Sequence, residues 1–440
     1  MPKDTGERPP KGTYFYASAE LGINLLLELH LVWLIPFYAR EAVHGASAAR
    51  NASIIGLGMA TGRVAEAVSD PVVGHVSDKT RTSIGRRLPY VLGAALPWAA
   101  ASWFCYHPPG GVQSPVAPYW GSAAFIAFSI LSAILISPYL AMMPDIARGG
   151  IARVKVSVAQ SVFRVAGVAS AALGIPLLIE HLGYAAAAAT CSAIALVSIA
   201  PIVLGPRDRP TEPEDEPRSA HRQGLWRGVA ETFQSTGFRA YAISFGLFWV
   251  GLRTAIAAVP FLAIAFLGIE GEGGVAPLLG ASIAVAVISF PFVPALARRV
   301  GRGRLFIFGM TALGLSFPLM VPLGTGLLPG DPKLWFMGIM AAIGVPAAVL
   351  FTVPYTILAD VIDEDAEKRG TRRDALFFGV QGLILKLAWG VGDLITTQCV
   401  GHLGATAERP TGLYVIAIAS GIFGVVGGLT YRAYQRRQAA

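Results

Sequence analysis

The 440-residue chain is 54% hydrophobic and only 14% charged, whereas a typical soluble domain has roughly 25% charged residues. Its apolar runs recur from Tyr14 to Tyr431 with only short polar breaks, so no separate soluble domain fits between them. The net charge of +8 does not indicate nucleic-acid binding, because the basic residues gather in alternate loops. The three isolated cysteines predict neither a disulfide framework nor a metal site.

Twelve stretches are long and apolar enough to cross a membrane as helices, which takes about 20 residues each. They lie at residues 14–39, 50–77, 88–106, 118–143, 155–179, 184–204, 239–268, 275–297, 304–327, 334–359, 374–402 and 411–432. When the N-terminus is placed in the cytoplasm, most of the 35 Lys and Arg fall on the inner side. We therefore expect an all-α, multi-pass protein of the cytoplasmic (inner) membrane, with both termini in the cytoplasm.

A charged, proline-rich stretch separates the sixth and seventh predicted helices and cannot bury a core of its own. We expect an N-terminal six-helix bundle at 1–205, a cytoplasmic linker at 206–237 and a C-terminal six-helix bundle at 238–440. Two dipeptides recur in corresponding helices of the halves: Pro36-Phe37 as Pro260-Phe261, and Pro138-Tyr139 as Pro354-Tyr355. Internal repeats of this kind are typical of secondary transporters.

The first predicted helix carries polar residues along one face. Glu20, Asn24 and Glu28 are spaced four apart, so all three project from the same side of the helix. In the eleventh predicted helix, Lys386 and Asp393 are seven residues apart and again share a face. A charge at the centre of a membrane helix costs about 2.5–3.5 kcal/mol even on lenient scales, so such residues are functional candidates.

The second predicted helix contains the strongest candidate for an ion site. Arg63, Glu66 and Asp70 follow each other at spacings of three and four residues and share one face. Two carboxylates one turn apart repel unless a cation or a proton lies between them. Oxygen ligands suit Na+, while burial beside a like charge favours a protonated carboxyl, so both Na+ and H+ remain open.

A purely structural role is the alternative for these charges, since buried acids and bases nearly balance and can form ion pairs within the protein. Arg164 and Arg253 stand alone on their predicted helices, and for these two the structural and functional interpretations weigh equally.

Four segments resemble motifs of the glycoside-pentoside-hexuronide:cation symporters, a family of the major facilitator superfamily that includes the melibiose carrier. The first is RVAEAVSDPVVGHVSDKTRTSIGRRLP at 63–89, which is similar to the family's second helix and the following loop. The others are AELGINLL at 19–26, PYLAMMPDIA at 138–147 and LADVIDEDAEKRGTRRDALFFGVQGLILK at 358–386. The resemblance covers both halves and implies the major facilitator fold of two six-helix bundles.

The resemblance also implies roles for particular residues in a carrier that alternates between outward and inward states around one cavity. Glu66 and Asp70 match the acids that bind the coupling cation, and Lys386 matches the lysine that links the cation and substrate sites. Asp393 is expected to act in coupling together with Lys386. The expected substrate-binding residues are Glu20, Asn24, Glu28, Arg63, Tyr139, Gln381, Lys386 and Trp389. The expected cytoplasmic gate comprises Asp78, Arg86, Arg87, Asp360, Asp363, Arg372 and Arg373, although solvated loop charges would have the same pattern.

The chain departs from the melibiose carrier at several expected substrate positions. Ile136 and Leu140 stand where that carrier places a sugar-binding aspartate and tryptophan, and its arginine of the fifth helix is not matched in register. These changes argue against a galactoside as the substrate. Glu66 replaces the usual aspartate and Glu28 is an additional acid, which keeps proton coupling open beside sodium.

The sequence predicts a cation-coupled symporter for a sugar or glycoside. The first alternative is a symporter for a lysophospholipid-like or other amphiphilic solute, and the second is a non-transporting membrane scaffold or assembly factor. An enzyme is not expected, because no nucleophile-base pair or metal cluster emerges. We expect no cofactor beyond the coupling ion, membrane lipids and a small-molecule substrate as partners, no nucleic acid, and a monomer.

Overall fold

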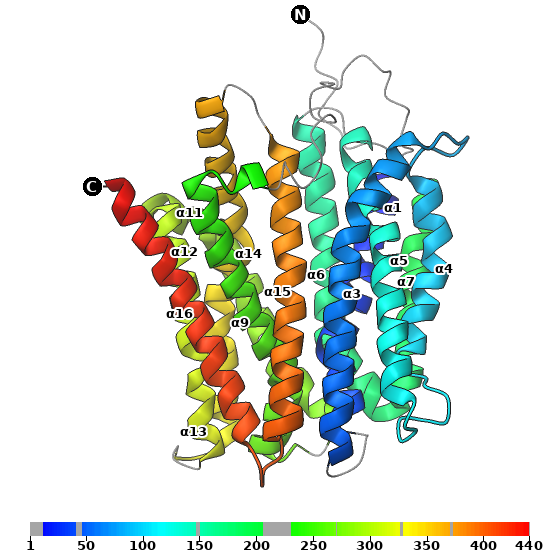
Figure 1. The fold of residues 1–440 in the computed structure, drawn as a ribbon, viewed down its shortest axis with the longest axis vertical. Coiled ribbons are helices and arrows are strands. Elements are labelled where there is room, and N and C mark those ends of the chain that lie inside the picture. The colour runs from blue at the N-terminus through cyan, green and yellow to red at the C-terminus, as the bar shows by residue number, and fades with distance from the viewer. Residues whose placement is uncertain are drawn as a thin grey trace, which may run out of the picture. The chain divides into compact units, whose positions relative to one another are not determined.

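The computed structural model describes residues 12–40, 46–146, 150–205, 230–269, 271–325, 329–369 and 373–439. Within these ranges the regular structure is helical throughout, without a strand (Figure 1). An all-helical fold satisfies every backbone polar group within the segment itself, as a membrane interior requires. The chain divides into two compact units, one of residues 1–216 with 271–276 and the other of residues 217–270 with 277–440.

The first unit is built around α2 and α5. Its helices are α1 (Thr13–Ala17), α2 (Ala19–Arg40), α3 (Ala46–Lys79), α4 (Leu88–Phe104), α5 (Ala117–Ile146), α6 (Gly150–Leu182), α7 (Tyr184–Ile199) and the short 3-10 helices η1 (Ala200–Leu204) and η2 (Glu272–Val275). The helix α2 packs against α6 and α7. The helix α5 packs against α3 and α4 (Figure 1). The polar face of α2 therefore meets α6, and the polar face of α3 meets α5.

The second unit is centred on α9 and α16. Its helices are α9 (Thr236–Leu267), α10 (Ala276–Ser289), η3 (Phe290–Phe292), α11 (Val293–Val300), α12 (Arg302–Ser316), η4 (Pro318–Met320), α13 (Val321–Gly324), α14 (Pro332–Arg369), α15 (Asp374–Gln398), the π-helical η5 (Cys399–Leu403) and α16 (Thr411–Ala439). The helix α16 lies along both α9 and α12, and α9 also packs against α15 (Figure 1).

Helices occupy most of the described residues of each predicted stretch, but only ten helices in the described part of the chain are long and apolar enough to span a membrane. The two exceptions are α3 and α4. The helix α4 has 17 residues, which is short for a span. The helix α3 has 34 residues but carries Arg63, Glu66 and Asp70 near its middle. The protein is thus a multi-pass membrane protein in which the candidate site itself weakens the hydrophobic signal.

Proline decides where two predicted helices are interrupted. The predicted helix 275–297 is divided into α10, η3 and α11, with Pro291 and Pro294 at the starts of the last two pieces. The predicted helix 304–327 is divided in the same way, with Pro318 and Pro322 at the starts of η4 and α13. Proline lacks the backbone N–H that would continue the α-helical ladder, so each piece begins afresh.

Close backbone contact joins α12 to α16. A Cβ atom added to Gly424 of α16 would lie 2.8 Å from the Cα of Gly314 and 2.9 Å from the carbonyl oxygen of Met310, both on α12. Neither atom belongs to a side chain that can move aside. Small residues at such positions let membrane helices approach closely enough for extensive van der Waals contact.

We expect Gly424→Ala to destabilise the second unit, because the added methyl group must push two backbones apart. Overpacking of this kind costs about 1–3 kcal/mol. The measurement is the thermal unfolding midpoint of the purified protein in detergent. Gly338→Ala on α14 is the matched control, since a Cβ at Gly338 meets nothing within 4 Å. Equal midpoints for the two variants would contradict the close-contact interpretation.

Candidate functional site

A buried carboxylate lies at the centre of a polar cluster in the first unit. The side chain of Glu20 on α2 is only 4% exposed. Arg164 on α6 donates to both of its oxygens, from Nε to Oε2 and from Nη2 to Oε1, each at 3.1 Å. This two-pronged geometry is the strongest that an arginine and a carboxylate can form. The predicted helix 1 acid therefore has a fixed orientation set by a helix far away in the sequence.

Gln160 extends the cluster from the same face of α6, one turn before Arg164. Its Nε2 atom lies 3.1 Å from the Tyr139 hydroxyl, 3.3 Å from Oε1 of Glu20 and 3.4 Å from the Tyr16 hydroxyl. The rings of Tyr16 and Tyr139 stack with centroids 4.7 Å apart. The cluster thus combines a charged pair, an amide and two aromatic hydroxyls, all of which can donate to or accept from a polar solute.

The two partners of the charged pair differ in their access to solvent. The Arg164 side chain is 50% exposed, whereas Glu20 is buried. Asn24, predicted on the same face as Glu20, donates to its Oε2 at 3.1 Å, and Glu28 lies half-buried further along α2. A group arriving from the exposed side would meet the guanidinium first.

The two predicted acids of the second helix lie beside different groups. Arg63 donates to Oε2 of Glu66 at 3.1 Å, and both side chains are buried. The Arg63 guanidinium also lies 5.2 Å above the ring of Phe125. Asp70 instead accepts a hydrogen bond of 2.8 Å from the Ser137 hydroxyl of α5. Glu66 is therefore partly neutralised by a base on its own helix, while Asp70 has a neutral oxygen donor beside it.

In the second unit, Arg253 of α9 forms an ion pair with Asp393 of α15. Both side chains are almost fully buried, at 1% and 0% exposure. The Thr396 hydroxyl donates to the Thr254 carbonyl at 3.2 Å and ties the same two helices together. Lys386 is half-buried on α15, two turns before Asp393. The sequence pattern placed Arg253 alone, and only the packing of α9 on α15 gives it a partner.

Gln381 and Trp389, both predicted to bind substrate, lie on α15. Gln381 donates to the Tyr241 hydroxyl of α9 at 2.5 Å. The Trp389 ring lies edge-on to Trp249, with centroids 5.8 Å apart. Both contacts connect α15 to α9, so the two residues are held in position by neighbours that the sequence motifs did not indicate.

The predicted gate residues that can be placed form ion pairs with unexpected partners. Asp360 pairs with Arg302 at 2.7 Å. Arg373 pairs with Asp365 at 2.8 Å and with Glu231 at 3.2 Å, neither of which was predicted. In the first unit, Arg87 donates to the Ala141 carbonyl and Arg86 lies next to it. Asp363, on α14 of the second unit, is exposed. The Asp78 side chain and Arg372 lie outside the described residues.

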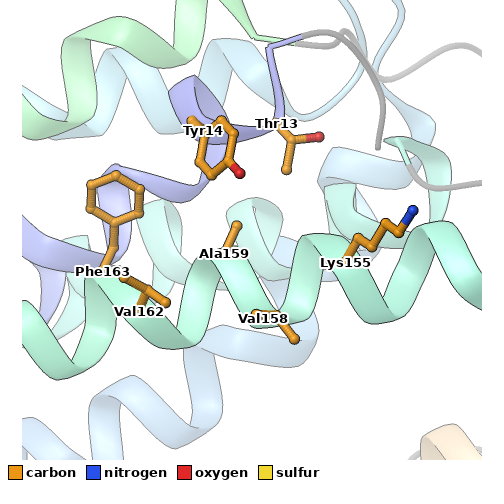
Figure 2. A pocket seen from close by; sticks show the side chains of 7 residues that line it. All are labelled: Thr13, Tyr14, Lys155, Val158, Ala159, Val162 and Phe163. Atoms are coloured by element: carbon orange, nitrogen blue, oxygen red, sulfur yellow. The ribbon is translucent and has the colours of Figure 1, made fainter. Parts of the chain in front are cut away.

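An apolar cavity of about 300 Å³ lies between α1 and α6. Figure 2 shows Lys155 at one end of it and Phe163 at the other, with Val158, Val162 and Tyr14 between them. None of the predicted site residues lines this cavity. The polar cluster, and not this cavity, is the candidate functional site of the first unit.

The motifs found only part of this cluster. Tyr16 and Gln160 were missed, and Arg164 was left without a partner. Gln160 lies four residues before Arg164, so the two share a helix face. This spacing could have indicated from the sequence that Gln160 lies beside Arg164. What the sequence lacked was the pairing of α2 with α6.

A family model for MFS/sugar transport proteins matches residues 15–429, nearly the whole chain. The chain belongs to this family. It is therefore a membrane transporter of the major facilitator type, which confirms the resemblance and the fold class inferred from the motifs.

Two relatives of this MFS/sugar transport protein match it over most of their length. The isoprimeverose transporter of Lactiplantibacillus pentosus is 21% identical over 426 residues, which cover 90% of this chain and 81% of that protein. The inner membrane symporter YicJ of Escherichia coli (strain K12) is 21% identical over 434 residues, which cover 94% of this chain and 88% of that protein.

Solved structures share the fold at low identity. The nucleoside transporter NupG matches with a TM-score of 0.68 at 13% identity, over 95% of this chain and 99% of that one. The POT family transporter PepTSo matches with a TM-score of 0.67 at 14% identity, over 98% of this chain and 99% of that one.

The buried pair of Arg253 and Asp393 allows a test of stabilisation that is separate from transport. We expect Arg253→Met or Asp393→Leu alone to destabilise the protein by about 3–5 kcal/mol, because each leaves a buried charge without its partner. The double variant should recover most of this loss, since it leaves no charge behind. The measurement is thermal unfolding in detergent, and a double variant as unstable as the sum of the singles would contradict the pairing.

Proposed function

We propose that this transporter is a cation-coupled symporter that moves a sugar or glycoside across the cytoplasmic membrane by alternating access. The observation that carries the proposal is the Glu20 cluster of the first unit. A sugar presents many hydroxyls, each both donor and acceptor, and the cluster offers a carboxylate, a guanidinium, an amide and two tyrosine hydroxyls. The partly exposed Arg164 is the group that would meet the solute first.

Coupling is assigned to the acids of α3. Asp70, with the Ser137 hydroxyl 2.8 Å away, offers oxygen ligands of the kind that Na+ prefers, and its carboxylate can equally take up H+. Glu66 lies one turn before Asp70 and forms an ion pair with Arg63. Neutralising Asp70 with either ion lowers the cost of enclosing it in a closed, dry state, which ties movement of the solute to the ion gradient. Lys386 and Asp393 are proposed to transmit this coupling in the second unit.

The family and the relatives support a sugar over the other solutes. The matching model describes sugar transport, one relative transports isoprimeverose and another is a symporter. An amphiphile was suggested only by Ile136 and Leu140, and a non-transporting scaffold would leave the buried polar cluster without use. We further propose that the protein lies in the inner membrane as a monomer with both termini in the cytoplasm, as the distribution of basic residues favours.

Neutralising Asp70 tests the cation site. We expect Asp70→Asn to abolish ion-driven accumulation of the sugar in proteoliposomes while sugar exchange at equal ion concentrations persists, because exchange needs no net ion movement. Gradients of Na+ at fixed pH, and of H+ without Na+, identify the ion. Glu180→Gln is the control, since Glu180 is an exposed acid of the same unit. Normal accumulation by Asp70→Asn would remove this cation site.

Neutralising Glu20 tests the substrate site independently of the ion. We expect Glu20→Gln to weaken sugar binding at least tenfold, because a charge-assisted hydrogen bond contributes about 1.5–3 kcal/mol. Binding is measured by equilibrium titration of the purified protein with a panel of mono- and disaccharides, pentosides and lysophospholipids. The Glu180→Gln control should bind like the unmodified chain. A variant that binds sugars with unchanged affinity would exclude the Glu20 cluster as the substrate site, and binding of lysophospholipids alone would exclude a sugar.

A further inference from the structure

A second hollow lies in the second unit, where the start of α12 meets the last turns of α16. It is a cavity of about 810 Å³ whose lining includes Gly301, Ile307 and Gln435 together with Arg304, Arg432 and Arg436. Gly301 has a φ of 92°, a left-handed conformation that turns the chain sharply between α11 and α12. The absence of a side chain at Gly303 leaves room for the Gln435 amide, because a Cβ there would lie 1.7 Å from its Nε2 atom.

Three exposed arginines surround this cavity, and no acidic side chain of the described residues pairs with any of them. Arg432 and Arg436 are one turn apart on α16, and Arg304 approaches from the first turn of α12. The neighbouring Arg302, by contrast, forms an ion pair with Asp360 at 2.7 Å. Three guanidinium groups around one hollow repel each other unless an anion lies between them.

Stabilisation of the helices does not account for all three charges. Cations are favourable near the C-terminal end of a helix and unfavourable near the N-terminal end, because of the helix dipole. Arg436 obeys this rule in the last turn of α16, whereas Arg432 lies two turns before the end of that helix and Arg304 opposes the rule in the first turn of α12. The helix dipole therefore gives no reason for Arg304 or Arg432, and an anion in the cavity would offset the charge of both.

An exposed apolar stripe leads away from the cavity along each helix. On α12, Phe308 and Leu315 follow Arg304 by four and eleven residues on the same face, and both are at least half exposed. On α16, the stripe consists of Leu429, Val426 and Ile422, all exposed and spaced by three and four residues. Both stripes belong to helices apolar enough to span the membrane. A molecule with an anionic head and long hydrocarbon chains matches this combination.

We infer that the α12–α16 cavity binds the headgroup phosphate of an anionic phospholipid, with its acyl chains along the two stripes. Arginine presents its N–H groups as a planar fork that fits two phosphate oxygens at once, and the Gln435 amide adds a neutral donor. Basic pockets between membrane helices are suited to lipid headgroups of this charge. A free phosphate ion shares the headgroup chemistry, but it would have no use for the apolar stripes.

The test is native mass spectrometry of the full chain in detergent, titrated separately with phosphatidylglycerol, phosphatidylcholine and inorganic phosphate. We expect one tightly bound phosphatidylglycerol, and at least tenfold weaker binding of this lipid to Arg432→Gln/Arg436→Gln, because charge-assisted hydrogen bonds are lost. The matched control is Arg299→Gln/Arg437→Gln, which removes the same charge from exposed residues outside the cavity. It should retain the lipid.

The apolar part of the site has its own variant. Leu429→Gln should weaken binding of phosphatidylglycerol while leaving all three arginines in place. Equal affinity for phosphatidylglycerol and phosphatidylcholine would overturn the proposal, as would equal losses in the two double variants. Competition by millimolar inorganic phosphate against the lipid would assign the cavity to a free anion instead. Unfolding midpoints of all variants, measured in the same detergent, show that each is folded, and sugar binding provides a readout independent of the lipid.

Discussion

The pairing of buried charges between helices is the constraint on which this structure depends. A charge in a membrane interior is tolerated only when a partner or a solvated cavity offsets its desolvation. Glu20 with Arg164, Glu66 with Arg63 and Asp393 with Arg253 meet this requirement in three ways. The first pair joins α2 to α6 and has one half-exposed partner, Arg164. The second lies within α3, and the third joins α9 to α15 with both side chains buried.

These differences suggest a division of roles between the two units. The Glu20 pair has an exposed partner and is surrounded by hydroxyl and amide groups, so it can exchange a protein contact for a solute contact. The Arg253 pair is almost fully buried and joins α9 to α15. Asp70, whose described hydrogen bond comes from a neutral hydroxyl, has oxygen ligands suited to an ion. We therefore propose that one type of interaction serves binding, coupling and stability, depending on its exposure and its neighbours.

The lipid proposal extends the same reasoning to the surface. Arg304, Arg432 and Arg436 gather where two helices converge, and their uncompensated charge indicates an anion from outside the protein. The exposed apolar stripes beside them lie on α12 and α16, two helices whose backbones approach closely at glycines. The site therefore follows from helix packing and not from any local motif.

The sequence alone determined the helical membrane fold, the approximate helix ends and the family, because apolar runs of spanning length and charged motifs are local signals. It also identified Glu20, Glu66, Asp70 and Lys386, since charges in lipid-spanning stretches stand out individually. Only the tertiary structure decided that Arg164 and Gln160 complete the Glu20 cluster, that Arg253 belongs to Asp393, and that Arg373 pairs with Glu231. Each of these contacts joins residues far apart in the chain, and helix periodicity specifies which face a side chain occupies but not which helix packs against that face.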